Sequence, residues 1–206
     1  MRTSNSPVSR ILGAAFEAFA EEGYAGASTL DIATRAKVSK RDLYANFGSK
    51  HAVLVACIES RADRMRPSPD LPAPHSRQTL ASTLTAFATK LVLEISDTTV
   101  IATFRLAIAE ATRSPEIAEA LDSAGRDATR RALAELLASA QATGLIGPAD
   151  PTEMAMQYLA LVWEGLMVGL LLGVEPPPEP AEARRRAVKA TAAFMQLHPD
   201  PAPGPA

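Results

Sequence analysis

The sequence predicts an all-α fold of nine helices, and two observations carry this prediction. Most of the 16 prolines fall into three clusters, at 67–74, 176–180 and 199–205. Proline interrupts a helix because it lacks the backbone N–H and its ring clashes with the preceding turn. The long alanine-rich stretches between the clusters are therefore free to be helical. No segment alternates apolar and polar residues in the manner of a strand.

The composition is that of an ordinary globular protein. Of the 206 residues, 47% are hydrophobic and 21% are charged, which excludes a disordered chain. The net charge of −2 excludes a protein that acts only through a strongly basic surface. The charge is unevenly spread, because residues 1–65 carry +2 and residues 66–206 carry −4. A basic N-terminal part permits a site for a polyanion.

The first helix runs from about residue 8 to residue 22. Ser6 is a suitable cap, Pro7 fits the first turn, and Gly23 ends the helix. Apolar side chains recur at helical spacing and form one face, which should be buried. They are Val8, Ile11, Leu12, Ala15, Phe16 and Phe19.

Three further short helices follow. The second and third begin after Ser28 and Ser39, and each has an aspartate three residues later, Asp31 and Asp42. This spacing resembles a capping box, in which hydroxyl and carboxylate satisfy the free N–H groups of the first turn. The fourth helix covers 49–65.

Five longer helices follow the first proline cluster. Asp150-Pro151 is a strong start signal for one of them. Their predicted ranges are 77–95, 98–113, 116–142, 152–173 and 181–197. This arrangement predicts an N-terminal domain over 1–50, a C-terminal domain over 51–198 whose first helix, 49–65, links the two, and a proline-rich tail over 199–206.

Residues 29–47 carry the pattern that indicates function. They read TLDIATRAKVSKRDLYANF, which is two short helices separated by a tight turn at 37–39. Ala33 is small enough for the second helix to cross closely, and Val38 and Leu43 pack the pair. The second helix exposes Lys40, Arg41, Ala45 and Asn46. This is the layout of a helix-turn-helix, whose second helix enters the DNA major groove.

Basic residues dominate the same stretch. Residues 28–50 contain five basic side chains and only two acidic ones, Asp31 and Asp42. This local excess supplies attraction to phosphate that the whole chain lacks. The basic residues are Arg35, Lys37, Lys40, Arg41 and Lys50.

Residues 11–58 resemble the DNA-binding domain of the TetR family of transcriptional regulators. The matching positions are Ala15, Phe19, Gly23-Tyr24, Ile32-Ala33, Val38-Ser39, Leu43-Tyr44, Phe47 and Ser49-Lys50. Residues 104–173 resemble, more weakly, the AefR-like subgroup of C-terminal domains. The resemblance implies a nine-helix TetR-like architecture, with a three-helix DNA-binding domain and a helical C-terminal domain for ligand binding and dimerisation.

The resemblance also implies individual roles in DNA binding. Thr29, Tyr44 and Lys50 match positions that contact phosphate, and Lys40 and Arg41 match the start of the base-reading helix. Lysine and arginine are the usual partners of guanine O6 and N7. The predicted DNA-binding residues are Thr29, Ser39, Lys40, Arg41, Tyr44, Asn46 and Lys50.

Three departures from the family pattern matter. Lys37 stands where the turn usually has glycine, so we expect it to adopt a left-handed conformation at a cost of about 1 kcal/mol. Asp42 replaces a hydroxyl residue that often touches phosphate, and we assign it to capping and to restraining Arg41. Leu30 stands where some members place a base-reading arginine, so the operator sequence cannot be transferred from a relative.

In the TetR family the last two helices form the dimer interface, which implies that the apolar stretch 154–174 and the helix 181–197 bury a self-complementary surface. The residues assigned to this interface are Gly165, Gly169, Val188, Thr191, Phe194 and Met195. Aromatic and methionine side chains, with a few polar groups, could line a pocket for a small apolar effector, although a stripe of this kind is more often part of the core. These residues are Phe87, Phe104, Arg105, Glu110, Met156, Trp163 and Met167.

The sequence fits three other classes of protein less well. The chain has no GxSxG, Walker or HExxH motif, so we do not expect an enzyme. The stretch 154–174 is long and apolar enough for a bilayer span, although Gln157 and Glu164 argue against one. A helical carrier of apolar ligands that has lost DNA binding is the runner-up. The favoured interpretation is a homodimeric, ligand-responsive regulator, most simply a repressor, that binds a pseudo-palindromic DNA site.

Cysteine and histidine usage gives no sign of a metal site. Cys57 is the only cysteine, which excludes an intrachain disulfide and a multi-cysteine metal site. The three histidines lie far apart in the sequence, so we expect no cofactor. We interpret Cys57 as an inert core thiol, with a redox role left open. A lone cysteine and the absence of a leader-like segment favour a cytoplasmic protein.

Overall fold

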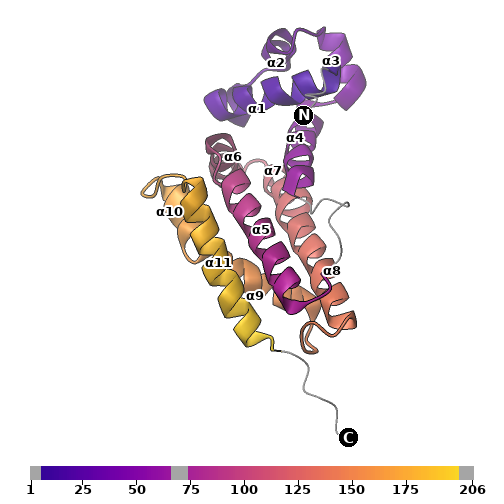
Figure 1. The fold of residues 1–206 in the computed structure, drawn as a ribbon. Helices are drawn as coiled ribbons and strands as arrows, with labels where there is room; N and C mark the ends of the chain where they lie inside the picture. The colour runs from indigo at the N-terminus through magenta and orange to yellow at the C-terminus, as the bar shows by residue number, and fades with distance from the viewer. Residues whose placement is uncertain (1–5, 66–73, 200–206) are drawn as a thin grey trace, which may run out of the picture. The chain divides into compact units, whose positions relative to one another are not determined.

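The computed structural model describes residues 6–65 and 74–199, except for the side chains of 61–65. Within these residues the chain is helical and contains no strand, so the predicted all-α class is confirmed, although these residues form more than the nine helices predicted (Figure 1). The proline clusters at 67–74 and 199–205 lie almost wholly outside the described residues, as does most of the predicted tail.

The helices pack into two compact units, and the first unit combines two stretches of the chain, 1–64 and 98–126. The packing therefore does not divide the chain at residue 50, because the segment 98–126 packs with the N-terminal helices. The helices of this unit are α1 (Pro7–Gly26), α2 (Thr29–Arg35), α3 (Lys40–Phe47), α4 (Lys50–Met65), α6 (Thr98–Glu110), α7 (Pro115–Ala120) and the π-helical η1 (Leu121–Asp127). The last residues of α4 and η1 belong to the second unit.

The first unit is held together by one apolar core. Ile11, Phe19, Ile32 and Leu43, from α1 to α3, are buried in it, and α4 adds Leu54. The later segment contributes the buried side chains Ala107, Ile117 and Ala120 to the same core. The N-terminal helices therefore complete their core only with residues that lie far along the chain.

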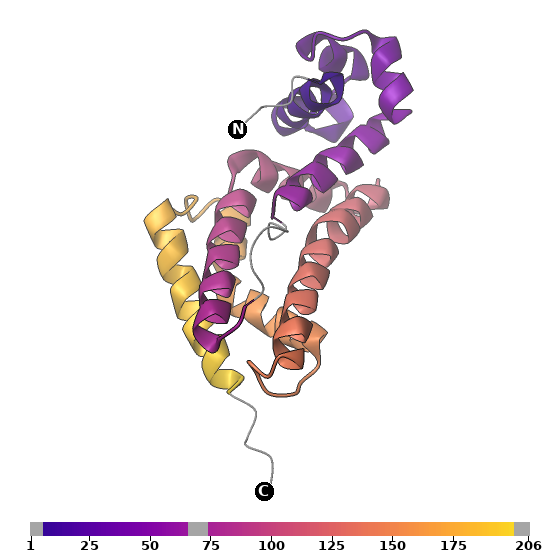
Figure 2. The same cartoon turned by 45° about the vertical axis from the view of Figure 1, so that its right-hand side comes forward.

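The second unit consists of α5 (Arg77–Ile95), α8 (Ala128–Ala142), α9 (Pro151–Trp163), α10 (Leu166–Leu172) and α11 (Pro180–Leu197). Helices α5 and α11 run side by side, and α9 packs against α8 and α11 (Figures 1 and 2). Tyr158 of α9 is fully buried, and its hydroxyl donates to the backbone oxygen of Leu84 at 2.7 Å. The same hydroxyl is 2.8 Å from Thr191 Oγ1 on α11. This polar pair inside the core fixes the relative position of three helices.

The helix starts follow the predicted capping signals. Ser6 accepts from the Ser9 N–H, and Pro7 occupies the first turn of α1. Ser28 accepts from the Asp31 N–H at the start of α2. Asp150 accepts from two N–H groups of α9. The helical path of α1 breaks at Gly23, where φ is 71°.

Two predicted helices are interrupted in the structure. The segment 116–142 contains the π-helical turn η1 between α7 and α8. The segment 152–173 is broken at Glu164 and Gly165, which both have left-handed φ, 34° and 85°. Arg186 donates to the Trp163 carbonyl at 3.1 Å at the end of α9. The prediction of one unbroken helix over 152–173 was wrong, because contacts from α11 support the break.

The apolar stretch 154–174 bears on the membrane hypothesis. Among residues 6–65 and 74–199, no single helix combines the length and apolar character of a bilayer span. Helices α9 and α10 meet these criteria only as a pair, and they are bent by 56° at the break between them.

Candidate nucleic-acid interface

Helices α2 and α3 form the predicted helix-turn-helix. Ala33 and Leu43 are 1% and 0% exposed, so the contact between the two helices is closed. The turn is tied by the Val38 N–H, which donates to the Ala33 carbonyl at 3.0 Å. Lys37 adopts φ 54°, which confirms the left-handed conformation expected at this position. A side chain other than glycine pays about 1–2 kcal/mol for it.

The start of α3 is fixed by a complete capping box. The Ser39 hydroxyl accepts from the Asp42 N–H at 3.0 Å, and Asp42 Oδ2 accepts from the Ser39 N–H at 3.2 Å. The Ser39 hydroxyl also donates to this carboxylate, and these bonds lower the pKa of Asp42 below its usual range. The capping role of Asp42 is thus confirmed. No ion pair between Arg41 and Asp42 occurs in the described part of the chain.

Exposed cationic side chains stand on this capped end. Lys40 and Arg41 occupy the first turn of α3, and both are exposed. The Lys40 ammonium lies 5.8 Å from the ring centre of Tyr44, one turn later. The Tyr44 hydroxyl lies 3.3 Å from Thr29 Oγ1, at the first residue of α2. The structure therefore brings four predicted DNA-binding residues onto one end of the helix pair.

Two other predicted residues have polar groups engaged within the protein. The Ser39 hydroxyl is used in the capping box. The Asn46 amide donates to the Asp42 carbonyl of its own helix at 2.7 Å. Bidentate reading of adenine by Asn46 would require that bond to break.

Lys50 is also engaged. Its ammonium donates to the Tyr24 and Ala27 carbonyls at 2.7 and 3.2 Å, and it lies 4.5 Å from the centre of the Tyr24 ring. An ammonium has three N–H donors, so one remains for a phosphate. Lys50 therefore fastens the end of α1 to the start of α4, in addition to its predicted role.

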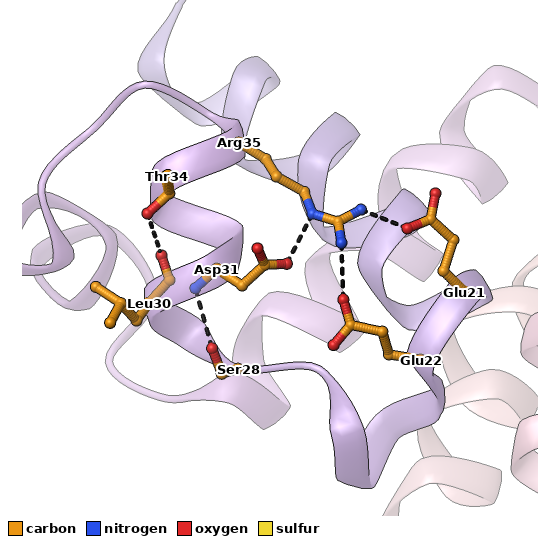
Figure 3. A network of polar contacts seen from close by, with 7 residues as sticks. All are labelled: Glu21, Glu22, Ser28, Leu30, Asp31, Thr34 and Arg35. Carbon is orange, nitrogen blue, oxygen red and sulfur yellow. Dashed lines mark hydrogen bonds and ion pairs between the residues drawn. The ribbon is translucent and has the colours of Figure 1, made fainter.

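Arg35 is a structural residue that the sequence analysis counted among the DNA-attracting cations. Figure 3 shows its guanidinium between three carboxylates. Its Nη1 and Nη2 donate to Glu21 and Glu22 at 2.6 and 2.7 Å, and its Nε lies 2.7 Å from Asp31. These contacts, the Glu21 bond first, raise the pKa of Arg35. The i, i+4 spacing from Asp31 was the only sequence signal for this role.

The local charge is correspondingly smaller than the sequence count suggested. The charge of Arg35 is balanced by Glu21, Glu22 and Asp31. Glu21 and Glu22 lie outside residues 28–50, over which basic side chains outnumber acidic ones by three. The exposed cations left on the helix pair are Lys37, Lys40 and Arg41. All three lie in the turn or in the first turn of α3, so the positive charge is concentrated at one end of the second helix.

The residues predicted to bind a ligand fall into both units. In the first unit, Phe104 lines an apolar groove on α6, while Arg105 is exposed and Glu110 is half-buried. The remaining members belong to the second unit, where Phe87 is buried in the core and Met156 is 47% exposed. Trp163 and Met167 are half-buried.

Three residues predicted for the dimer interface lie inside a single chain. Thr191 and Phe194 are 3% and 0% exposed, because the apolar stripe of α11 faces α5 and α9 of its own chain. Gly169 is buried, and a Cβ atom there would lie 2.7 Å from the Glu175 side chain. These three are therefore not available to a partner. Gly165 and Val188 are exposed, and Met195 is half-buried.

The chain matches two models of protein families. Residues 11–57 match the model described as bacterial regulatory proteins of the tetR family. Residues 82–198 match the C-terminal domain of AefR-like transcriptional repressors. No curated protein matches the chain.

Solved structures agree with the family models. A TetR transcriptional regulator from Agrobacterium tumefaciens is 27% identical, with a TM-score of 0.79, and the match covers 95% of this chain and 96% of that one. A TetR-family regulator from Mesorhizobium loti is 25% identical, with a TM-score of 0.76 and coverage of 96% and 98%. The flavonoid-responsive regulator FrrA is 29% identical, with a TM-score of 0.72 and coverage of 96% and 98%.

These matches cover both the helix-turn-helix and the C-terminal helices. The capped α3, its exposed cations and the closed contact with α2 are what a DNA-binding protein of this kind requires. The chain belongs to the TetR family of DNA-binding transcriptional regulators, with an AefR-like C-terminal domain.

Proposed function

We propose that the protein is a repressor that binds a pseudo-palindromic operator as a homodimer and is released by a small apolar effector. The observation that carries the DNA-binding part is the end of α3, where a capping box holds Lys40 and Arg41 exposed at the helix start. In this kind of motif the N-terminal residues of the second helix contact base edges. Thr29 and Tyr44 stand beside them as candidate phosphate contacts.

The proposed dimer uses the exposed faces of α9, α10 and α11. Five large apolar side chains on these helices are between 47% and 71% exposed, namely Met156, Val168, Leu172, Val188 and Leu197, and Val174, just after α10, is 73% exposed. A contiguous exposed apolar patch is typical of an interface, and these side chains are the candidates for one. A two-fold dimer places two copies of α3 on half-sites one helical turn apart, about 34–36 Å.

The proposed effector site is the groove that Phe104 lines in the first unit. It has a volume of about 300 Å³, and its walls are Phe104, Ala107, Ile108, Ala111, Ala118 and Leu121. An ion pair between Asp122 and Arg126, at 2.5 Å, supplies the polar edge. Ile108 is 62% exposed, so the groove offers apolar surface to a ligand. A relative of similar length responds to a flavonoid, which supports an aromatic ligand with polar substituents.

Footprinting on the DNA that flanks the gene tests the proposal, with and without flavonoids such as naringenin. We expect one protected site with two-fold symmetry and its loss on adding an active ligand. Salt-dependent, sequence-selective binding would separate the repressor from an apolar-ligand carrier that no longer binds DNA. Protection that no ligand changes would remove the effector part and leave a constitutive DNA-binding protein.

A further inference from the structure

A second groove lies in the first unit, on the side of α1. It has a volume of about 340 Å³ and is lined by α1 together with Ser60 of α4 and Thr99 of α6. From α1 it takes Ser6, Val8, Ser9, Leu12, Gly13, Phe16 and Glu17. None of these residues belongs to the helix-turn-helix or to the effector groove. The volume lies near the lower end of the range for small-molecule sites, about 300–1,000 Å³.

Gly13 opens the floor of this groove. It lies in the middle of α1, and a Cβ atom built there would meet nothing within 4 Å. Its φ is not in the left-handed region, so the backbone does not require glycine at this position. Glycine inside a helix costs about 1 kcal/mol relative to alanine. The chain thus keeps an open space at a position where alanine would stabilise the helix.

The groove has an apolar floor and a charged edge. Leu12 and Phe16, one turn apart, supply apolar and aromatic surface. Glu17 lies one turn beyond Gly13 on the same line of α1, and it is exposed. Its carboxylate has no ion-pair partner among the residues whose side chains are described. Hydroxyl groups of Ser9, Ser60 and Thr99 complete the edge.

We propose that this groove is a second binding site, for a small amphipathic amine. The apolar body lies over Gly13 and against Phe16, and the ammonium pairs with the Glu17 carboxylate. A cation is favoured over an anion because, among the described residues that line the groove, Glu17 is the only one with a charged side chain. The phenyl ring of Phe16 also favours a cation or another ring over a purely aliphatic chain.

A series of three probes with one body tests the charge preference: 4-phenylbutylamine, 4-phenylbutanol and 4-phenylbutyrate. Each is titrated into the full-length protein while the amide signals of Gly13 and Thr99 are followed by NMR. We expect the amine to bind about threefold tighter than the alcohol, as for an exposed ion pair, and the carboxylate to bind weakest. Saturable binding with equal affinity for all three would overturn the proposal, and so would no saturable binding of the amine at millimolar concentration.

Two pairs of variants locate the site. Gly13→Leu places a side chain in the open space and should weaken binding of the amine at least tenfold, whereas Gly13→Ala should change the affinity for the amine by less than threefold. Glu17→Gln should abolish the preference for the amine over the alcohol, and Glu59→Gln, an exposed control on α4, should keep it. Amine binding that Gly13→Leu leaves unchanged would place the probe elsewhere and overturn the assignment.

The fold and the proposed DNA binding are checked separately in the same variants. The added Cβ at Gly13 meets no atom within 4 Å, and leucine has a higher helix propensity than glycine, so Gly13→Leu should unfold at the wild-type temperature or above. Operator binding by this variant, measured without probe, should match the wild type. A variant that binds the operator but not the amine supports the groove, and a wild-type protein that binds the amine but no DNA supports the groove without the repressor.

Discussion

The cationic side chains around the helix-turn-helix are of two kinds. Some are exposed, and others are hydrogen-bonded or ion-paired within the protein. Arg41 is exposed and lies in the first turn of α3, whereas the Lys50 ammonium donates two hydrogen bonds to backbone carbonyls. Similar positive charges therefore have different consequences for DNA binding. The Arg41 side chain is available to a base edge, and the Lys50 ammonium has at most one donor for a phosphate.

Arg41→Ala should cost about 1–3 kcal/mol of binding free energy on the operator and relax base preference at one position, because it removes a candidate partner of guanine. Lys50→Ala should weaken binding to all sequences alike and lower the salt slope by about one unit. Gel-shift titrations on operator and random DNA at several salt concentrations measure both effects. Equal losses by Arg41→Ala on the two DNAs would contradict base reading.

Arg35→Met should lower the melting temperature, because it leaves Glu21, Glu22 and Asp31 close together without their shared counter-charge. Added salt screens that repulsion, so the difference from the wild type should shrink as salt rises. Thermal unfolding at low and high salt measures this. Arg131→Met, which removes a more exposed partner of Asp127, is the control. If Arg35→Met also lowered the salt slope of DNA binding by one unit, Arg35 would be a phosphate contact.

At the scale of the helices, the hydrogen bonds that join Tyr158 of α9 to α5 and α11 give the clearest test of packing. Tyr158→Phe should destabilise the protein by about 1–3 kcal/mol, because the buried Leu84 carbonyl and the Thr191 hydroxyl both lose a partner. Chemical denaturation followed by circular dichroism measures the change. Tyr24→Phe, which has no such buried bond to its hydroxyl, is the comparison. A change within 0.5 kcal/mol for Tyr158→Phe would show that water replaces the bond.

The C-terminal end of α11 should make stability depend on pH. Burial lowers the pKa of His198 from its usual value of 6.5, so the folded state favours the neutral ring. The unfolded chain then binds more protons near pH 6, and stability falls as pH drops through this range. Unfolding at pH 7.5, 6.5 and 5.5 should show the decline, and it should be smaller in His198→Gln. An identical decline in that variant would assign the effect to other groups.

Helix starts were predictable from sequence and helix interruptions were not, for a physical reason. The capping residues Ser6, Ser39 and Asp150 act within one turn of the chain, so their spacing is visible in the sequence. The break at Glu164 and Gly165 is accompanied by contacts from α11, including an ion pair between Lys189 and Glu164 at 2.9 Å. Such contacts join residues far apart in the chain, and local propensity contains no information on them.

The candidate DNA-binding site was likewise predictable only where nearby residues specify it. The sequence identified the exposed end of α3, because motif spacing and charge specify it. The sequence did not show that Arg35 and Lys50 are engaged within the protein, since their partners lie on α1 and at its end. It also assigned Thr191 and Phe194 to a partner molecule. An apolar helix face has the same pattern whether it meets its own chain or another copy.

At the scale of the whole molecule, the proposed dimer has a testable surface. Val188→Arg should shift the protein towards monomers, because it places a charge on an exposed apolar part of α11 without entering the core. Sedimentation velocity measures the change. Arg184→Ala, which changes an exposed charged side chain one turn before Val188 on the same helix, is the control. An unchanged dimer in Val188→Arg would move the interface elsewhere, and monomeric wild-type protein would remove it.

The core of the first unit has a consequence for the order of events on the ribosome. Helices α1 to α4 share their core with Ala107, Ile117 and Ala120, which are made about 43 to 56 residues after residue 64. At synthesis rates of about 5–20 residues per second, these partners follow the DNA-binding helices after roughly 2–11 s. During this interval the emerging chain carries positive charge and uncovered apolar surface. The core of the DNA-binding helices can therefore be completed only after α5, α6 and α7 have been translated.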